Sequence, residues 1–261
     1  MTATRLIFAF VLSFFLSAVA SAAPDSKPYP AHQTSYAAIQ ADIAQARKTA
    51  IEDETLLLIA LGGNWCHDSV GFVEKMQDKQ VAALFQDRYT VQLVNVGNLE
   101  FIRDIVKQYD VPVIYGTPTV LVIEPNSDSL LNRDSLSYWR SADALSIDDT
   151  EKYFAAFTPG QMPETEQVGA ELSNAYERIA DFEQEQAERL YVAYADLGRL
   201  MTDSGDSKPP ADFVEKWQNV GAMRSSITTD LASLRASARE QDQRGVNPIE
   251  LNFPHYDLYI D

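Results

Sequence analysis

The sequence predicts an α/β fold, with a central mixed sheet flanked by helices, followed by a C-terminal α-helical hairpin. Up to about residue 157, short apolar runs of strand length alternate with longer segments in which apolar residues recur at helical spacing. Beyond residue 160 only the helical spacing recurs, and one proline-containing break, Asp203–Pro210, divides it. The 261 residues, 46% of them hydrophobic, are enough to bury a sizeable core.

The α/β part is expected to contain four helices, over residues 35–52, 66–89, 99–109 and 148–157, the second of them interrupted near Asp78. Four strands are expected between them, over residues 56–61, 90–96, 119–123 and 136–140. The run LLLIAL is continuously apolar, and TVLVI is apolar after its first residue, which is typical of buried strands. TVQLVNV alternates and predicts a strand with one buried face. LSYWR is expected to form a fourth strand at the sheet edge, and acidic residues favour the start of the last helix.

The C-terminal region predicts two helices, over 164–201 and 213–238, that together form a helical hairpin. The final segment, LNFPHYDLYID, is aromatic and extended, and it is expected to pack back on the domain or to cover a sheet edge. The hairpin is either a stabilising appendage or an arm for self-association or partner docking, and the sequence leaves both interpretations open.

The first 22 residues have the pattern of a cleavable signal peptide. Arg5 precedes the apolar run Leu6–Leu16, and Ala20–Ala22 has the small residues of a cleavage site. The alternative is an uncleaved N-terminal anchor. We therefore expect a signal peptide over 1–22, a thiol-bearing α/β domain over 23–160, and a helical region over 161–261, in a periplasmic or secreted protein.

Composition limits the classes of partner. Lys and Arg number 21 against 38 Asp and Glu, which gives a formal net charge of −17. Nucleic-acid binding depends on clustered basic residues, so we expect no nucleic-acid partner. No later segment is apolar enough to cross a membrane, so we expect no membrane association after cleavage.

The chain has one cysteine, Cys66, which lies where a buried strand and a glycine loop lead into a helix. A helix N-terminus favours a thiolate over a thiol, and the thiolate is the nucleophile in thiol chemistry. Pro118 enters the run 119–123, where proline is unusual for a central strand. A cis bond between Thr117 and Pro118 is expected to account for it.

With these two motifs, the chain resembles the thioredoxin family over Ser35–Phe157. The matching residues for its W-C-x-x-C helix start and its cis-proline turn are Trp65, Cys66, Ser69, Pro118 and Thr119. The similarity extends to exported bacterial thioredoxin-like proteins with a monothiol W-C-x-x-S site. It implies a thioredoxin-like fold with Cys66 exposed, Thr117 and Pro118 pairing with a bound strand, and Trp65 beside the groove.

The sequence also departs from the family pattern. Ser69 replaces the second cysteine, whose thiolate would release a bound partner from a mixed disulfide. Ala60 stands where the family pattern has a buried aspartate. A mixed disulfide on Cys66 would persist until an external thiol cleaved it. Isomerisation, exchange with small thiols and capture of a client remain open.

The leading hypothesis is thiol–disulfide exchange, with Cys66 as the nucleophile, Ser69 as its hydrogen-bond partner and His67 assisting when protonated. Trp65, Thr117 and Pro118 would bind the substrate, which would be a thiol- or disulfide-containing protein client or a small thiol. We expect no cofactor. We also expect no metal, because Cys66, His67 and Asp68 are adjacent and cannot easily close a tetrahedral site.

The alternative hypothesis is a non-catalytic protein of the same fold, which binds a partner through its groove and helical hairpin. The lost second thiol favours this alternative, and the retained W-C-x-x-S and T-P-T motifs favour exchange. Whether the chain is an enzyme, an oxidoreductase or isomerase without a resolving cysteine, is left open.

Overall fold

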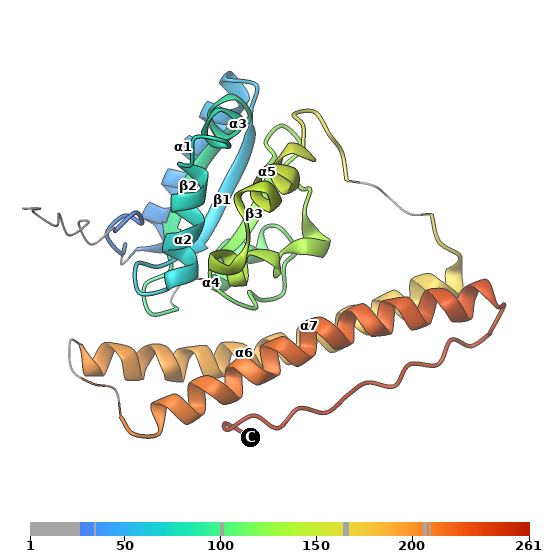
Figure 1. Ribbon diagram of the computed structural model, residues 1–261. Helices are drawn as coiled ribbons and strands as arrows, with labels where there is room; N and C mark the ends of the chain where they lie inside the picture. Colours follow the sequence, from blue (N-terminus) through green and yellow to red (C-terminus); the bar gives the residue numbers. More distant parts are fainter. Residues whose placement is uncertain (1–26, 34, 100–101, 164–166, 206–207, 209) are drawn as a thin grey trace, which may run out of the picture.

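A computed structural model describes residues 27–33, 35–99, 102–163, 167–205, 208 and 210–261 (Figure 1). The expected signal peptide therefore lies outside the described residues. Within the described ranges, no helix is both long enough and apolar enough to span a bilayer.

The sheet has four strands in the order β2-β1-β3-β4. Strand β1 (Leu56–Gly62) pairs in parallel with β2 (Tyr89–Asn95) and antiparallel with β3 (Thr119–Glu124), which pairs antiparallel with β4 (Ser129–Leu130). Every residue of β1 and β3 is buried, which explains why both runs are mainly apolar. The mixed sheet is as expected.

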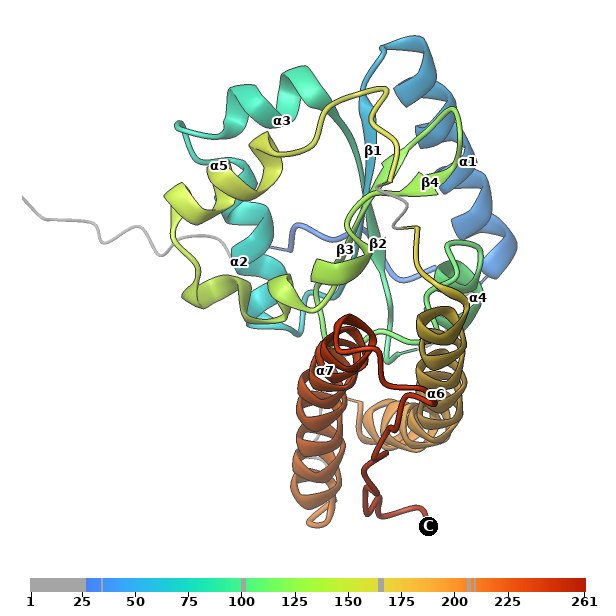
Figure 2. The same ribbon diagram turned by 90° about the vertical axis from the view of Figure 1, so that its right-hand side faces the viewer.

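Helices cover both faces of the sheet, which Figure 2 shows edge-on between them. One face carries α1 (Tyr36–Glu52) and α4 (Ile102–Lys107), and the other carries α2 (His67–Met76), α3 (Ala82–Arg88) and α5 (Ile147–Ala155). The expected interruption near Asp78 is confirmed, because α2 ends at Met76 and α3 begins at Ala82.

Alternate residues of β1 belong to two different cores, as strand geometry requires. Leu57, Ile59 and Leu61 pack with α1, α4 and the C-terminal helices. Leu56 and Leu58 pack on the opposite face, in an aromatic core with Phe72 and Phe154 among its members. This strand order, with helices on both faces, is a thioredoxin-like α/β fold.

The prediction of a strand over 136–140 is wrong. Two 3-10 helices, η1 (Arg133–Ser135) and η2 (Tyr138–Ala144), occupy this region, and the fourth strand is β4. Beyond β4, the side-chain amide of Asn132 accepts a hydrogen bond from Val122 N (2.9 Å) and donates one to Val120 O (2.8 Å). These bonds satisfy β3 where a longer edge strand would have paired.

The aromatic residue Trp139 of this segment packs in the core and does not lie at a sheet edge. The Trp139 side chain is fully buried, with its ring centroid 5.0 Å from that of Phe72 and 5.0 Å from that of Phe154. A compact helical turn can direct this large side chain into the core, whereas an edge strand would have spread the segment along β3.

The C-terminal region forms the expected hairpin. Helix α6 (Ala170–Ser204, 35 residues) and α7 (Phe213–Gln243, 31 residues) lie side by side below the sheet, at the end where β1 finishes (Figure 1). Helix α6 begins at Ala170, later than the 164 that the sequence suggests, and Gly169 is its N-cap. The final segment packs back along the hairpin, where Ile249, Tyr256 and Leu258 are buried.

Helix α6 is joined directly to the loops at this end of the sheet. The hydroxyl of Tyr194 donates to Ile114 O (2.7 Å), and that of Tyr191 donates to Pro112 O (2.9 Å). The amide of Asn98 donates to the Thr202 hydroxyl at 2.9 Å. The backbone of Asn98 also lies against Gly198, so closely that a Cβ there would come 2.1 Å from Asn98 O.

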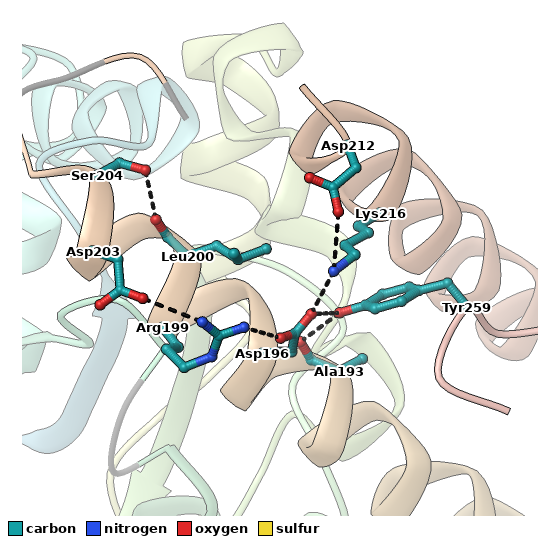
Figure 3. A network of polar contacts seen from close by, with 9 residues as sticks. All are labelled: Ala193, Asp196, Arg199, Leu200, Asp203, Ser204, Asp212, Lys216 and Tyr259. Atoms are coloured by element: carbon teal, nitrogen blue, oxygen red, sulfur yellow. Dashed lines mark hydrogen bonds and ion pairs between the residues drawn. The ribbon is translucent and has the colours of Figure 1, made fainter. Parts of the chain in front are cut away.

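One carboxylate links the three C-terminal segments, as Figure 3 shows. Asp196 of α6 accepts hydrogen bonds from Arg199 (2.8 Å), from Lys216 of α7 (3.1 Å) and from Tyr259 of the final segment (3.1 Å). The Arg199 guanidinium is the largest cause that holds the pKa of Asp196 below its usual value.

The contact at Gly198 predicts that Gly198→Ala destabilises the protein. The added methyl group would overlap backbone rather than a movable side chain, so we expect a loss of about 1–3 kcal/mol in the free energy of unfolding. Gly221→Ala in α7 is the matched control, because its nearest atom, Arg224 Nη2, is 3.8 Å away. It should stabilise by about 0.5–1 kcal/mol through helix propensity. Equal effects of the two changes in urea unfolding would contradict this packing.

The Asp196 network predicts a pH-dependent contribution to stability. A lowered folded-state pKa means that the contribution is present above the unfolded-state pKa and is lost as the pH falls through the folded-state value. Asp196→Asn should therefore lower the free energy of unfolding by about 1 kcal/mol at pH 7 and by less below about pH 4. Urea unfolding at both pH values measures the difference, with the exposed Asp181→Asn on the same helix as control. A deficit that stays constant with pH would contradict the assignment.

Candidate functional site

Cys66 is the N-cap residue of α2, directly after the loop that leaves β1. Its side chain is partly exposed, and Sγ donates to the backbone oxygen of Thr117 at 3.2 Å, across 51 residues of sequence. The Thr117–Pro118 peptide bond is cis, as expected. The two motifs that the sequence singled out therefore meet at one point.

Trp65 lies beside the thiol and is 40% exposed. Its indole Nε1 donates to Gly97 O at 2.7 Å, which fixes the ring against the loop after β2. On its other side the ring meets Trp217 of α7 edge to face, with centroids 6.1 Å apart. Trp65 therefore flanks Cys66 while it contacts the hairpin, which the sequence did not suggest.

His67 and Asp68 differ in exposure and in contacts. The side chain of His67 is 79% exposed, with Nε2 3.2 Å from Asp68 Oδ2. The other oxygen of Asp68 accepts from the backbone N–H of Asp143 at 3.0 Å, which ties the first turn of α2 to η2. Asp68 therefore has a structural partner of its own, and His67 points to solvent.

Ser69 is fully buried and does not hydrogen-bond to Cys66; the bond from Sγ goes to Thr117. Its hydroxyl lies against that of Tyr29, behind the backbone of Gly62. A Cβ on Gly62 would come 2.6 Å from Ser69 Oγ and 2.5 Å from Tyr29 Oη, so this packing requires glycine. The role of Ser69 as a partner of the thiolate stays a prediction.

Tyr29 is a site residue that the sequence analysis missed. Burial raises the pKa of its hydroxyl, and the nearby Cys66 raises it further, so the phenol stays neutral behind the thiol. Asn64 holds the segment in place, because its side chain accepts from Tyr29 N (3.0 Å) and donates to Tyr29 O (3.0 Å). A large aromatic residue between Pro28 and Pro30 in a polar leader was the available signal.

The thiol opens into a cavity of about 460 Å³ between the α/β domain and the hairpin. Cys66, Thr117 and Arg140 line it from the domain, and Trp217 and Arg224 of α7 line it from the opposite side. No periodicity in the C-terminal helices could have indicated this, because helical spacing does not say which neighbour a helix faces. In the described part of the chain, no three His, Cys, Asp or Glu side chains are grouped so that they could hold a metal ion.

Comparisons with known proteins give little beyond the fold. No family model matches the chain, and no curated protein matches it. A solved structure, the disulphide isomerase from Xylella fastidiosa Temecula1, aligns with 50% of this chain and 96% of its own at 21% sequence identity and a TM-score of 0.42. At this level of similarity, the fold assignment rests on the strand order and the helix arrangement described above. The chain has a thioredoxin-like fold whose one thiol faces a cavity that α7 lines on one side.

The contacts of Asn64 predict that this residue holds the buried Tyr29 segment behind the thiol. Asn64→Ala removes both hydrogen bonds, so hydrogen exchange of the Tyr29 amide should accelerate, by about tenfold for about 1.4 kcal/mol of lost local stability. Asn64→Asp keeps the acceptor for Tyr29 N and loses the donor, and should give an intermediate rate. Unchanged exchange in Asn64→Ala would show that the segment is held elsewhere.

Proposed function

We propose that this protein performs thiol–disulfide exchange through Cys66, as a monothiol nucleophile. The observation that supports this best is the position of Sγ. Sγ is partly exposed at the N-cap of α2, lies 3.2 Å from Thr117 O beside the cis-proline turn, and borders a cavity large enough for a ligand. The helix N-terminus provides unpaired N–H groups that favour negative charge on sulfur.

The exchange needs no external oxidant or reductant. The Cys66 thiolate attacks one sulfur of a disulfide, a new S–S bond forms on Cys66, and the other sulfur leaves as a thiolate. A second thiol in solution then restores Cys66 by the reverse type of step. Since Cys66 is the one cysteine in the chain, no internal thiol can release the adduct. Net reduction of a substrate by this chain alone is therefore excluded.

The surrounding residues have proposed roles that follow from their places. Thr117 and Pro118 would hold the attacked group beside the thiol, and Trp65 would form one wall. Ser69, one helical turn after Cys66, would donate its hydroxyl hydrogen to the thiolate. His67, which is exposed, would act only on groups that approach from solvent.

We also propose that the protein is exported, with residues 1–22 removed and with 23–160 and 161–261 as its two structural regions. The support is the charged, apolar and small-residue order of the N-terminal segment. A single unpaired thiol in an oxidising compartment would meet small disulfides and exposed disulfides of other proteins.

The alternative is a non-catalytic binding protein, and one observation favours it. The position of the missing second thiol is occupied by Ser69, which is fully buried. No thiol at this position can therefore cleave a mixed disulfide on Cys66. Binding through the groove and hairpin would then be the function. In that case Cys66→Ala would leave partner binding intact.

Exchange predicts fast, selective modification of Cys66 in the folded protein. With the neutral probe 2-hydroxyethyl disulfide, we expect folded protein to form a stable mixed disulfide at least about tenfold faster than urea-unfolded protein, because the helix N-terminus favours thiolate. Intact mass reports the adduct, and on protein from the cell envelope it also reports whether residues 1–22 are absent.

Three substitutions complete this test. Cys66→Ala should form no adduct. Ser69→Cys should stop the adduct from accumulating, because the second thiolate would displace the probe and form an internal disulfide. Ser69→Ala is the control that keeps one thiol and should still accumulate adduct. A folded protein that reacts no faster than the unfolded one would overturn the proposed exchange.

A further inference from the structure

We propose that the Cys66 cavity accepts small thiols and disulfides that carry carboxylates, and that Arg140 and Arg224 bind those carboxylates. The inference rests on the thiol–disulfide exchange proposed above and specifies its substrate class. It assigns to the C-terminal hairpin half of the binding site, a role that neither the W-C-x-x-S motif nor the cis-proline turn suggests.

The size of the cavity and the position of its walls favour a small molecule. Its volume of about 460 Å³ lies within the range of about 300–1,000 Å³ typical of ligand pockets. Thr117 lines one side, and α7 lines the other with Trp217, Gly221 and Arg224. Helix α7 thus lies across the cavity from Thr117, and a small disulfide needs less of the space between them than an extended polypeptide does.

The charge of the cavity favours an anion. Arg140 and Arg224 both line it, and neither forms an ion pair with any described residue. Other arginines of the chain are paired with carboxylates, for example Arg103 with Glu188 and Arg235 with Glu183. In a protein with a formal net charge of −17, two arginines that lack acidic partners and face one thiol mark a local site for negative charge.

The carboxylate that lines the cavity does not neutralise this site. Asp68 accepts a hydrogen bond from Asp143 N at 3.0 Å, and its other oxygen faces His67 Nε2 at 3.2 Å. Both oxygens of Asp68 therefore have partners other than the two arginines. The guanidinium groups remain available for a bound anion.

Both arginines have packing contacts beside the cavity. The guanidinium of Arg224 lies over the rings of Trp217 (5.7 Å) and Tyr194 (5.9 Å). The side chain of Arg140 packs against Gly116, where a Cβ would come 2.7 Å from Arg140 Cβ. A planar guanidinium that is oriented in advance binds a carboxylate with two parallel hydrogen bonds, which lysine cannot reproduce.

The reaction step conserves atoms and electrons. The Cys66 thiolate attacks the nearer sulfur of a carboxylate-bearing disulfide RS–SR, the Cys66–SR bond forms, and RS⁻ leaves with the electron pair of the broken bond. The bound carboxylates would orient the disulfide, and they would offset the repulsion that an acidic protein exerts on an anionic substrate.

The test compares three disulfides on the purified full-length protein: oxidised glutathione (anionic), 2-hydroxyethyl disulfide (neutral) and cystamine (cationic). Each rate of adduct formation is divided by the rate for N-acetylcysteine with the same probe. The net charge of the protein alone would give the order cationic, neutral, anionic. We expect the anionic probe to be favoured over the neutral one by about three- to tenfold at low salt, and less at high salt.

Variants assign the effect to residues. Arg224→Gln and Arg140→Gln should each lower the rate with oxidised glutathione, relative to the rate of the same variant with the neutral probe, by about three- to tenfold. Arg224→Lys keeps the charge and should retain part of the preference. Arg244→Gln, at the exposed end of α7 where it pairs with Glu240, is the matched control and should change neither rate.

The outcomes separate this inference from the function on which it rests. A normalised order of cationic, neutral, anionic in the wild type, or a preference that both arginine variants leave unchanged, would overturn the anionic substrate class while exchange stands. If even the neutral probe reacts no faster with the folded protein than with the unfolded protein, the proposed exchange itself is overturned. A preference that depends on salt and on Arg224 supports the inference, even if Arg140→Gln fails to fold.

Discussion

The structure depends on one constraint, that β1 is buried on both faces. A strand with Leu56, Leu57, Leu58 and Ile59 in sequence exposes apolar side chains alternately to each side, so each face of the sheet needs a cover. Helices α2, α3 and α5 cover one face with an aromatic core, and α1 and α4 cover the other. The second core continues into the C-terminal hairpin, so the hairpin belongs to the same hydrophobic unit as the sheet.

The candidate site follows from where β1 ends. The chain leaves β1 at the edge of the sheet where α2 starts, so Cys66 becomes an N-cap. Thr117 and Pro118, which directly precede β3, lie beside it. The hairpin packs at this same end, through the close approach of Gly198 to Asn98 and the contact of Trp65 with Trp217. The thiol therefore faces a helix from the opposite end of the sequence, and this helix forms one wall of the cavity.

Two features behind and around the thiol show how contacts distant in sequence define its surroundings. Tyr29 fills the space behind Ser69 and is held by Asn64, so the leader segment closes the back of the site. Arg140 and Arg224 reach the front from η2 and α7. Neither pair is close in sequence, and neither belongs to a motif that spacing alone could reveal.

The sequence by itself determined the elements whose signal is local. The apolar runs predicted β1 and β3, the interruption near Asp78 separated α2 from α3, and the W-C-x-x-S and T-P-T motifs predicted a thiol at a helix start beside a cis proline. The tertiary structure decided the rest. Asn132 ended the sheet edge and Trp139 turned inward, so 136–140 is helical rather than extended. Helical spacing placed α7 on a core but could not say that its Trp217 and Arg224 face Cys66, because the direction in which a helix packs depends on partners remote in sequence.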